Sequence, residues 1–441
     1  MASVKKIDPK SENACHNGLN VFTLPPTNVS VLRSTKREVL PLNTVDESPY
    51  EFRVNGDSQW LDLSYTKLYI QCQIQKRDGV QWVNLTAADT LVAPVQTLGQ
   101  SFIRQLKVSL NGTETYDSGT LYPFMTYIKN ELNYSPIVKD TAMAAGGYYR
   151  EERVDDATSA GFVERNRLMG QSEVVEFEAP LDFDLANQPL FLLPNVEVLF
   201  TIYKHDDNFL IQTLLPNDTN VYRLKVHNVR LRVKTVEVGS TVNVAVADSL
   251  EKTTAKYYMR KTEARSCYLT PGRTEFVYNV FANQKPRRVI LAMVNNHSYN
   301  GHIAKNPFNF QPFDVREISL NVGGVVHPTF SYNMRWVDLP KSFIRAYSDM
   351  QDATMLEPLN TTNGISLPQF IDGWTFFVFP LSPTLEDNNW MELAQTNSTT
   401  LTVRFNRPIP DPGVSLICIG EFDQVIYIDQ NRNVATDGTV S

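Results

Sequence analysis

The sequence has little cysteine, no excess of positive charge and no long hydrophobic run. Its four cysteines, Cys15, Cys72, Cys267 and Cys418, are scattered singly, which indicates neither a disulfide framework nor a zinc site and favours a reducing compartment. The formal net charge of -7 disfavours direct binding of nucleic acid by the folded body. The longest apolar stretch, around residues 374–381, is too short to span a membrane, and the N-terminus lacks an apolar signal-peptide core.

The common signatures of catalysis and cofactor binding are also missing. The sequence contains no G-x-G-x-x-G, G-x-x-x-x-G-K-[ST], H-E-x-x-H or G-x-S-x-G motif. We therefore predict that the protein is not an enzyme and that it has no catalytic, cofactor-binding or metal-binding residues.

Two acidic clusters come nearest to a chemical site. His205, Asp206 and Asp207 place an imidazole beside two carboxylates at a strand end, but a solvated strand end explains them better. The pairs Glu151-Glu152 and Asp155-Asp156 offer carboxylates for glycoside chemistry, although adjacent side chains point apart in an extended chain.

Two further groups suggest binding rather than catalysis. Arg230, Arg232 and Lys234 lie on one face of a predicted strand, where they could meet nucleic acid, although a solvated or intersubunit face is the favoured interpretation. The tryptophans Trp60, Trp82 and Trp390 could form a carbohydrate platform, but burial in a core explains single tryptophans more economically.

What the sequence does contain favours an all-β protein. It has 23 Phe, 19 Tyr and 25 Pro with only 20% charged residues, a balance that suits sheets and turns. Leu68, Ile70, Cys72 and Ile74 alternate with polar residues, as in a half-buried strand. The strand at 106–110 ends at Asn111-Gly112, which predicts a hairpin, and a phase slip at His227-Asn228 predicts a β-bulge.

Other segments are irregular or helical. The spacing of apolar residues predicts a short helix over 122–132 capped by Asn133, and an amphipathic stretch over 334–347. Residues 140–172 show no sustained period and indicate a long excursion between strands. The last strands are predicted at 414–419 and 425–428.

The 441 residues can supply two cores of ordinary size. We predict an N-terminal arm at 1–45, a first unit at 46–240, a linker at 241–256, a second unit at 257–434 and a C-terminal tail at 435–441. The apolar, proline-rich segment 21–27 of the arm is expected to lie on a surface of its own chain or of a neighbour.

The two units look like copies of one topology. Arg104 and Arg316 begin similar strand-and-turn sequences, RQLKVSLNG and REISLNVGG, and lie 212 residues apart (316 − 104). Pro180-Leu181 and Pro380-Leu381 each close a strand and lie 200 residues apart (380 − 180). These similar offsets favour a duplication. With about eight short strands and a long excursion in each unit, we predict two tandem eight-stranded jelly rolls with a few short helices in loops, a double jelly roll.

Several blocks of the sequence resemble landmarks of one protein family. They are VFTLPPTNVSV, YEFRVNGDSQWLDLSYTKLYIQCQI, VSLNG, KNPFNF (residues 305–310) and EFDQVIYIDQNRNV (residues 421–434). Together they resemble the major capsid protein of Polinton/Maverick elements and adintovirus-like viruses, in colinear order from about Val21 to Val434. One departure is DLSYT at 62–66, where the family usually has DLANT.

The resemblance implies a structural protein of the virion shell. It implies a homotrimer of pseudo-hexagonal outline that tiles an icosahedral capsid, made in the cytoplasm or nucleus of a host cell. The implied partners are neighbouring capsomers, penton proteins and minor capsid proteins, without sequence-specific nucleic acid binding and without a transmembrane segment. It also implies that loops such as 140–172 and 348–366 cover the trimer top or clamp adjacent subunits.

Two other classes of function stay open at this point. An amidase or glycosidase of double jelly-roll type would need acidic residues to converge in a cleft between the two units. A glycan-binding protein would need exposed tryptophans on one surface.

Overall fold

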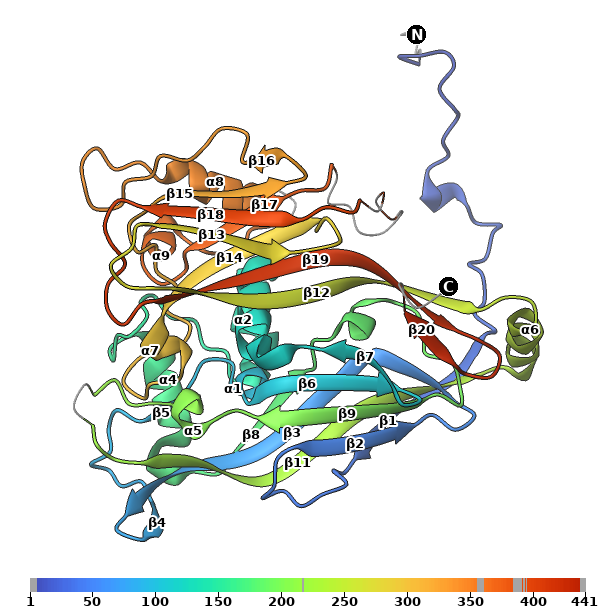
Figure 1. The fold of residues 1–441 in the computed structure, drawn as a ribbon. Coiled ribbons are helices and arrows are strands. Elements are labelled where there is room, and N and C mark those ends of the chain that lie inside the picture. Colours follow the sequence, from blue (N-terminus) through green and yellow to red (C-terminus); the bar gives the residue numbers. More distant parts are fainter. Residues whose placement is uncertain are drawn as a thin grey trace.

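The computed structural model describes residues 6–215, 218–354, 361–383, 391, 393 and 395–436. The described chain forms two β-sandwiches stacked on each other, joined at one end by the helix α6 (Ser240–Leu250), as Figure 1 shows. We call the part from β1 to β11 the first half and the part from β12 to β20 the second half. The all-β prediction is confirmed.

Two sheets face each other in the first half. One has the order β1-β11-β3-β4, with β8 also paired to β3, and the other has the order β2-β9-β6-β7. Their strands are β1 (Val31–Val39), β2 (Tyr50–Asn55), β3 (Trp60–Asp78), β4 (Gln81–Asn84), β6 (Ile103–Leu110), β7 (Thr113–Asp117), β8 (Val175–Pro180), β9 (Glu197–Lys204) and β11 (Tyr222–Val238). A small separate pair joins β5 (Ala93–Pro94) to β10 (Ile211–Gln212).

The second half repeats this arrangement. One sheet has the order β12-β19-β14-β17, with β20 paired to β19, and the other has the order β13-β18-β15-β16. The strands are β12 (Ala255–Leu269), β13 (Glu275–Phe281), β14 (Arg288–Asn295), β15 (Val315–Val322), β16 (Val325–His327), β17 (Phe376–Pro380), β18 (Thr399–Phe405), β19 (Val414–Ile428) and β20 (Val434–Thr436).

The strand order identifies both halves as jelly rolls. If β4, β5, β10 and β20 are set aside, each half has eight strands in the described chain, and its sheets read first–eighth–third–sixth and second–seventh–fourth–fifth. The two landmarks of the repeat occupy equivalent places: Arg104 and Arg316 lie in the fourth strands, and Pro180 and Pro380 end the sixth strands. The predicted double jelly roll is therefore confirmed.

Helices lie in the connections between strands. They are α1 (Leu98–Ser101), α2 (Tyr122–Asn133), α3 (Pro136–Asp140), α4 (Ala160–Met169), α5 (Asp207–Leu210), α7 (Asn296–Tyr299), α8 (Ile344–Asp352) and α9 (Leu367–Ile371). Short 3-10 turns are η1 (Asn17–Leu19), η2 (Gly119–Leu121), η3 (Ala142–Gly146), η4 (Gly170–Ser172) and η5 (Asp184–Asn187). Among the described residues, no helix is long and apolar enough to cross a membrane.

Alternating apolar residues build the core of each sandwich. In β6 the side chains of Leu106, Val108 and Leu110 are fully buried, and the strand ends in the predicted hairpin, with Asn111 at φ 46° and Gly112 at φ 81°. The predicted bulge in β11 is also present, because the pairing with β3 shifts between Val226 and Asn228.

Four segments differ from the expectations. The strand β1 lies inside the residues assigned to the arm. The helix α4 lies inside the excursion 140–172, and of the stretch 334–347 only the residues from Ile344 onward are helical. The two predicted closing strands form one strand, β19, because its middle residues 420–424 continue an unbroken pairing with β12. The division at 241–256 stays a prediction; α6 begins one residue before it, at Ser240.

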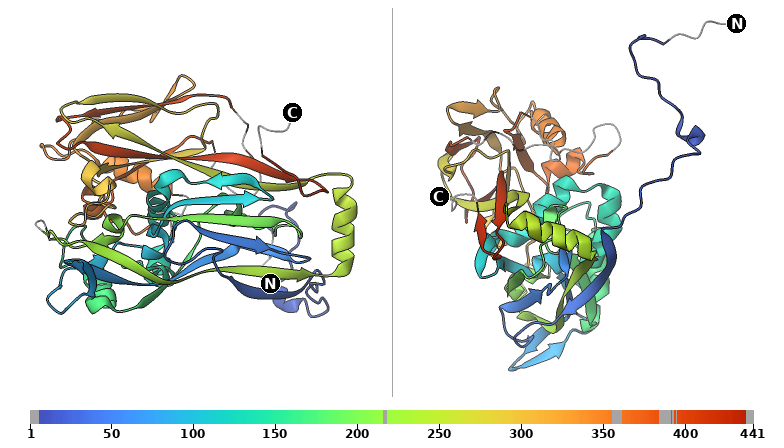
Figure 2. Two further views of the ribbon diagram at one scale, coloured as in Figure 1. Left: turned by 60° about the horizontal axis from the view of Figure 1, so that its bottom comes forward. Right: turned by 90° about the vertical axis from the view of Figure 1, so that its right-hand side faces the viewer.

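The N-terminal segment before β1 runs away from the body of the molecule, as Figure 1 and the right-hand view of Figure 2 show. Three of its apolar side chains, Val21, Phe22 and Leu24, are exposed, Phe22 by 97%. They contribute nothing to either core.

Candidate functional site

The residues His205, Asp206 and Asp207 do not form a chemical site. The ring of His205 stacks on that of Phe209 at 3.8 Å between centroids, and burial, with Arg104 and Lys204 nearby, lowers the pKa of His205 to about 3. The carboxylate of Asp207 pairs with Lys204 and accepts the backbone N–H of Leu224 at 3.2 Å. These groups fix the end of β9 in place. In the described chain, no three His, Cys, Asp or Glu residues gather so that they could hold a metal ion.

The carboxylates at 151–156 have separate structural tasks. Glu151 is buried and pairs with the buried Arg165 at 2.6 Å. Glu152 accepts the backbone N–H of Ala160 at 3.3 Å, at the start of α4. Asp156 accepts the N–H and hydroxyl of Thr158, at 2.8 and 2.7 Å. The pairs therefore do not present two free carboxylates to a substrate.

Asp155 has a different role, because it connects the two halves. Its carboxylate accepts the backbone N–H of Asn306 at 2.6 Å and the side-chain amide of Asn309 at 2.8 Å. Both asparagines belong to the KNPFNF block of the second half. Burial raises the pKa of Asp155, while the hydrogen bonds from Asn306 and Asn309 oppose the rise.

The three cations on β11 are neutralised inside the chain. Arg230 and Arg232 both pair with Glu38 of β1, at 2.7 and 3.0 Å, and Lys234 pairs with Asp62 of β3 at 3.0 Å. Hydrogen bonds from the two arginines lower the pKa of Glu38. This ladder ties β1 and β3 to β11, so it offers no free positive face to a polyanion.

The tryptophans do not gather on one surface in the described chain. The indole N–H of Trp60 donates to Asn243 of α6 at 2.9 Å, and the guanidinium of Arg223 lies 4.4 Å from the ring centre of Trp82. Trp390 lies outside the described residues. Trp60 and Trp82 thus serve separate local contacts.

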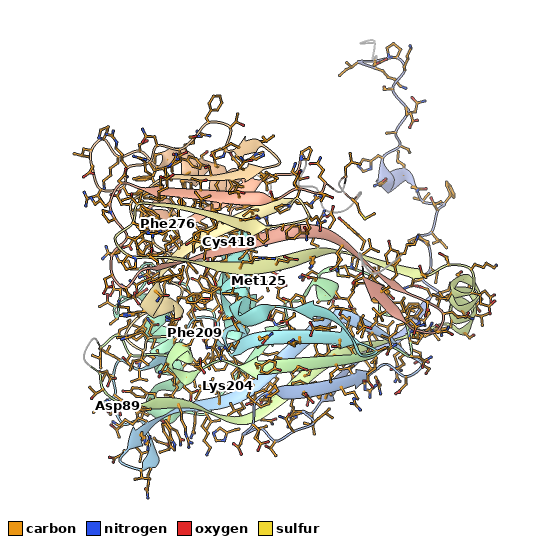
Figure 3. The ribbon with its side chains drawn as sticks, viewed as in Figure 1. Asp89, Met125, Lys204, Phe209, Phe276 and Cys418 are labelled. Atoms are coloured by element: carbon orange, nitrogen blue, oxygen red, sulfur yellow. The ribbon has the colours of Figure 1, made fainter. Side chains whose placement is uncertain are left out.

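Aromatic and charged side chains of the two halves meet in one contact region, which we call the seam. Its centre is the helix α2 of the first half, which packs on the connection between β14 and β15 of the second (Figure 1). Tyr127 stacks on Phe308 at 4.2 Å, and Phe124 contacts Tyr299 at 5.3 Å and Phe209 at 5.6 Å between centroids. Figure 3 marks Met125 of α2 and Phe209 in this region. All but Tyr299 are buried.

Buried polar groups connect the halves around this aromatic centre. Lys139 is 3% exposed and donates to the Glu131 carboxylate at 2.7 Å and to the carbonyl of Asn363 at 2.8 Å. Arg288 of β14 forms a bidentate pair with Glu421 and also donates to Asn133 at the end of α2. Such directional contacts fix one relative position of the halves.

The seam also encloses a cavity of about 490 Å³. Its charged lining residues are Lys67, Lys129, Glu178, Asp182, Arg260, Arg288 and Glu421. The cations are paired with carboxylates: Lys67 with Glu178 at 3.1 Å, Lys129 with Asp182 at 2.8 Å, and Arg260 with Asp423. Arg288 pairs with Glu421, so each of these charged side chains has a partner within the chain.

Reasoning from the sequence missed Lys129, Lys139 and Arg288, since single charged residues in strands and helices carry no motif. Two blocks of the sequence nevertheless contain residues of the seam. The blocks KNPFNF and EFDQVIYIDQNRNV supply Phe308, Phe310 and Glu421, and all three lie at the seam or beside it.

Comparison by sequence gives a relative of the chain but no family. No protein-family model matches the chain. The uncharacterized protein F54H12.2 of Caenorhabditis elegans is 29% identical over 402 residues, which are 89% of this chain and 94% of the nematode protein.

Among solved structures, a chain of the Sputnik virophage is similar with a TM-score of 0.62 and 11% identity, over 99% of this chain and 95% of that chain. The mavirus major capsid protein is similar with a TM-score of 0.59 and 9% identity, over 100% of this chain and 97% of that chain. The Faustovirus major capsid protein reaches a TM-score of 0.52 at 8% identity, over 92% of each chain. The chain therefore has the double jelly-roll fold found in these viral major capsid proteins.

Proposed function

We propose that this protein is the major capsid protein of a virus or virus-like element, and that three copies form a capsomer of pseudo-hexagonal outline. Many such capsomers would tile an icosahedral shell, together with penton and minor capsid proteins. The chain would act as a structural component of the virion, without enzymatic activity.

The observation that carries this proposal is the repeated strand order. Two jelly rolls of identical topology in one chain give six similar units in a trimer, so a three-fold molecule presents six comparable edges to its neighbours. The likeness to viral capsid proteins over nearly the whole chain supports the same conclusion.

The finer assignment, to the Polinton/Maverick and adintovirus-like lineage, is also a proposal. It is supported by the sequence landmarks and by the relative from a nematode, which is consistent with an element that resides in animal genomes.

Sizing of the purified protein tests the proposal. Three copies of the 50.1 kDa chain give a particle of about 150 kDa, measurable by light scattering after gel filtration. Electron microscopy should then show three-fold particles or closed shells. A protein that remains a 50.1 kDa monomer at every concentration tested, without such particles, contradicts the proposal.

A further inference from the structure

One contact of the seam brings together three buried side chains of complementary chemistry. Lys139 of α3 and Asn363, in the segment between α8 and α9, belong to opposite halves, and Glu131 of α2 contacts the lysine. Glu131 and Lys139 are each 3% exposed, and Asn363 is fully buried. A lysine amine, the amide carbon of an asparagine and a carboxylate that can carry a proton are the groups needed to form an amide bond between side chains.

The Nζ atom of Lys139 lies against both other residues. It is 2.7 Å from Oε2 of Glu131 and 2.8 Å from the backbone carbonyl oxygen of Asn363. A further acceptor is the backbone carbonyl of Glu131, also at 2.7 Å. Because Cγ of Asn363 is four bonds from its backbone oxygen, it lies about 3–7 Å from the amine, within reach of a rotamer change of the lysine.

An ion pair alone leaves two features of this contact unexplained. Nδ2 of Asn363 and Oε1 of Glu131 are buried, and neither has a hydrogen-bond partner in the described chain. Buried polar groups are usually paired, because an unpaired group loses the hydrogen bonds that it made with water. Both atoms have a role in amide bond formation, since Nδ2 is the leaving group and Oε1 can pass a proton to it.

The side-chain carbonyl of Asn363 is polarised by the backbone. Its Oδ1 atom accepts the N–H of Ile365 at 2.9 Å, and this donor would stabilise the negative charge that develops on the oxygen during attack by an amine. The next residue, Gly364, has φ 77°, and a Cβ there would lie 2.5 Å from Pro136 of α3. The close approach of the two halves at this point therefore depends on a glycine.

Little water can enter this contact. The cavity that the three side chains line has a volume of about 10 Å³, about the space of one water molecule. Two other charged residues line it, and both are engaged elsewhere: Arg150 donates to the carbonyl of Gly364 at 3.1 Å, and Glu151 pairs with Arg165 at 2.6 Å. Exclusion of water protects a reacting amide carbon from hydrolysis.

We propose that Lys139 and Asn363 form an isopeptide bond that links the two halves of the chain covalently. Glu131 takes a proton from the ammonium group of Lys139, and the amine then attacks Cγ of Asn363. A bond forms between Nζ and Cγ, and the bond between Cγ and Nδ2 breaks. Two protons pass in turn from Nζ through Glu131 to Nδ2, which leaves as an ammonium ion, and the carboxylate is regenerated. The reaction needs no oxidant, reductant or cofactor, and it concerns the single chain, so it does not depend on assembly.

Mass spectrometry of the purified wild-type protein tests the bond. Loss of ammonia lowers the mass by about 17 Da. Trypsin should no longer cleave after Lys139, so peptide mapping should find residues 130–150 joined to the peptide that contains Asn363. A free tryptic peptide that ends at Lys139 in place of this product would overturn the proposal. So would the same mass loss confined to residues 363–364, because an Asn-Gly sequence can also close to a succinimide.

Variants separate the roles of the three residues. Asn363→Ala and Lys139→Arg should abolish the bond, and Glu131→Gln should slow its formation at least about a hundredfold, because an amide does not accept the proton. Asn309→Ala is the matched control, since it removes another side-chain amide that connects the halves and should leave the bond intact. The bonded fraction is followed over time after cell-free synthesis, and circular dichroism checks that each variant is folded. Bond formation at the wild-type rate in Glu131→Gln would overturn the mechanism.

Cleavage between the halves gives a second measurement on the folded protein. With a specific protease site in residues 251–254, the cleaved wild-type chain should run as one band on a denaturing gel, and the Asn363→Ala chain as two. Two bands from the wild type would contradict the bond even where a variant fails to fold. The strength of the non-covalent contacts of the seam is accordingly measured in the Asn363→Ala variant.

Discussion

The stability of the folded protein should depend on the protonation of Asp184 near neutral pH. Its carboxylate is 4% exposed and accepts the N–H of Thr262 across the seam. Burial raises the pKa of Asp184 from its ordinary 3.8 to about 7; Lys129 opposes the rise and Asp182 adds to it. Because the folded-state pKa is the higher one, the folded protein prefers the protonated acid. This contribution to stability is complete below about pH 4 and is lost as the pH rises through 7.

The variant Asp184→Asn should remove this pH dependence, because the amide is neutral and keeps an oxygen to accept the N–H of Thr262. We expect it to be more stable than wild type at pH 8 by roughly 2–4 kcal/mol, with the difference shrinking toward pH 4. Urea unfolding at several pH values measures this. Parallel stability–pH curves for the two proteins would show that Asp184 does not titrate as described.

At the scale of single elements, the two fourth-to-fifth-strand hairpins depend on glycines in a left-handed conformation. Gly112 has φ 81° and Gly324 has φ 89°, and no atom would lie within 4 Å of an added Cβ at either position. Gly112→Ala and Gly324→Ala should therefore each lower the free energy of unfolding by about 1–2 kcal/mol through backbone strain alone.

Gly170→Ala is the control for both hairpins. Gly170 also has open space around it, but its φ of -56° suits any residue, so stability should stay the same or rise slightly. Chemical denaturation compares the three variants. Equal effects at all three positions would mean that the positive φ is not the cause.

The elements that could be predicted from the sequence are those with one buried face. Alternation identified β3, β6 and the bulged β11, and the turn residues identified the first hairpin. The strand β1 could not be found this way, because its exposed residues show no apolar period. The polar residues inside β19 suggested a break, yet Glu421 and Asp423 remain extended because arginines of β14 and β12 pair with them.

At the scale of the molecule, the duplication was readable from the sequence but the seam was not. The offsets between landmarks depend only on residue order. The contact of Tyr127 with Phe308, or of Lys139 with Asn363, depends on how two finished sandwiches are placed, and no local pattern encodes that placement. The role of Asp155 could not be predicted for the same reason. It was considered for catalysis, but its carboxylate binds the second half.

The seam should hold the two halves together even without the covalent link between them. A site for a specific protease can be introduced between α6 and β12, in residues 251–254, and cleaved in the folded protein. We expect the two fragments to elute together and to unfold in a single transition, because the buried aromatic side chains and ion pairs of the seam would become exposed on separation. Gel filtration and calorimetry of the cleaved protein measure this.

Tyr127→Ala should weaken the association of the fragments, whereas Val163→Ala, at an exposed position of α4, should leave it unchanged. Fragments that separate under native conditions would show that the halves are held by the linker alone, and a rigid six-part trimer would then lose its physical basis.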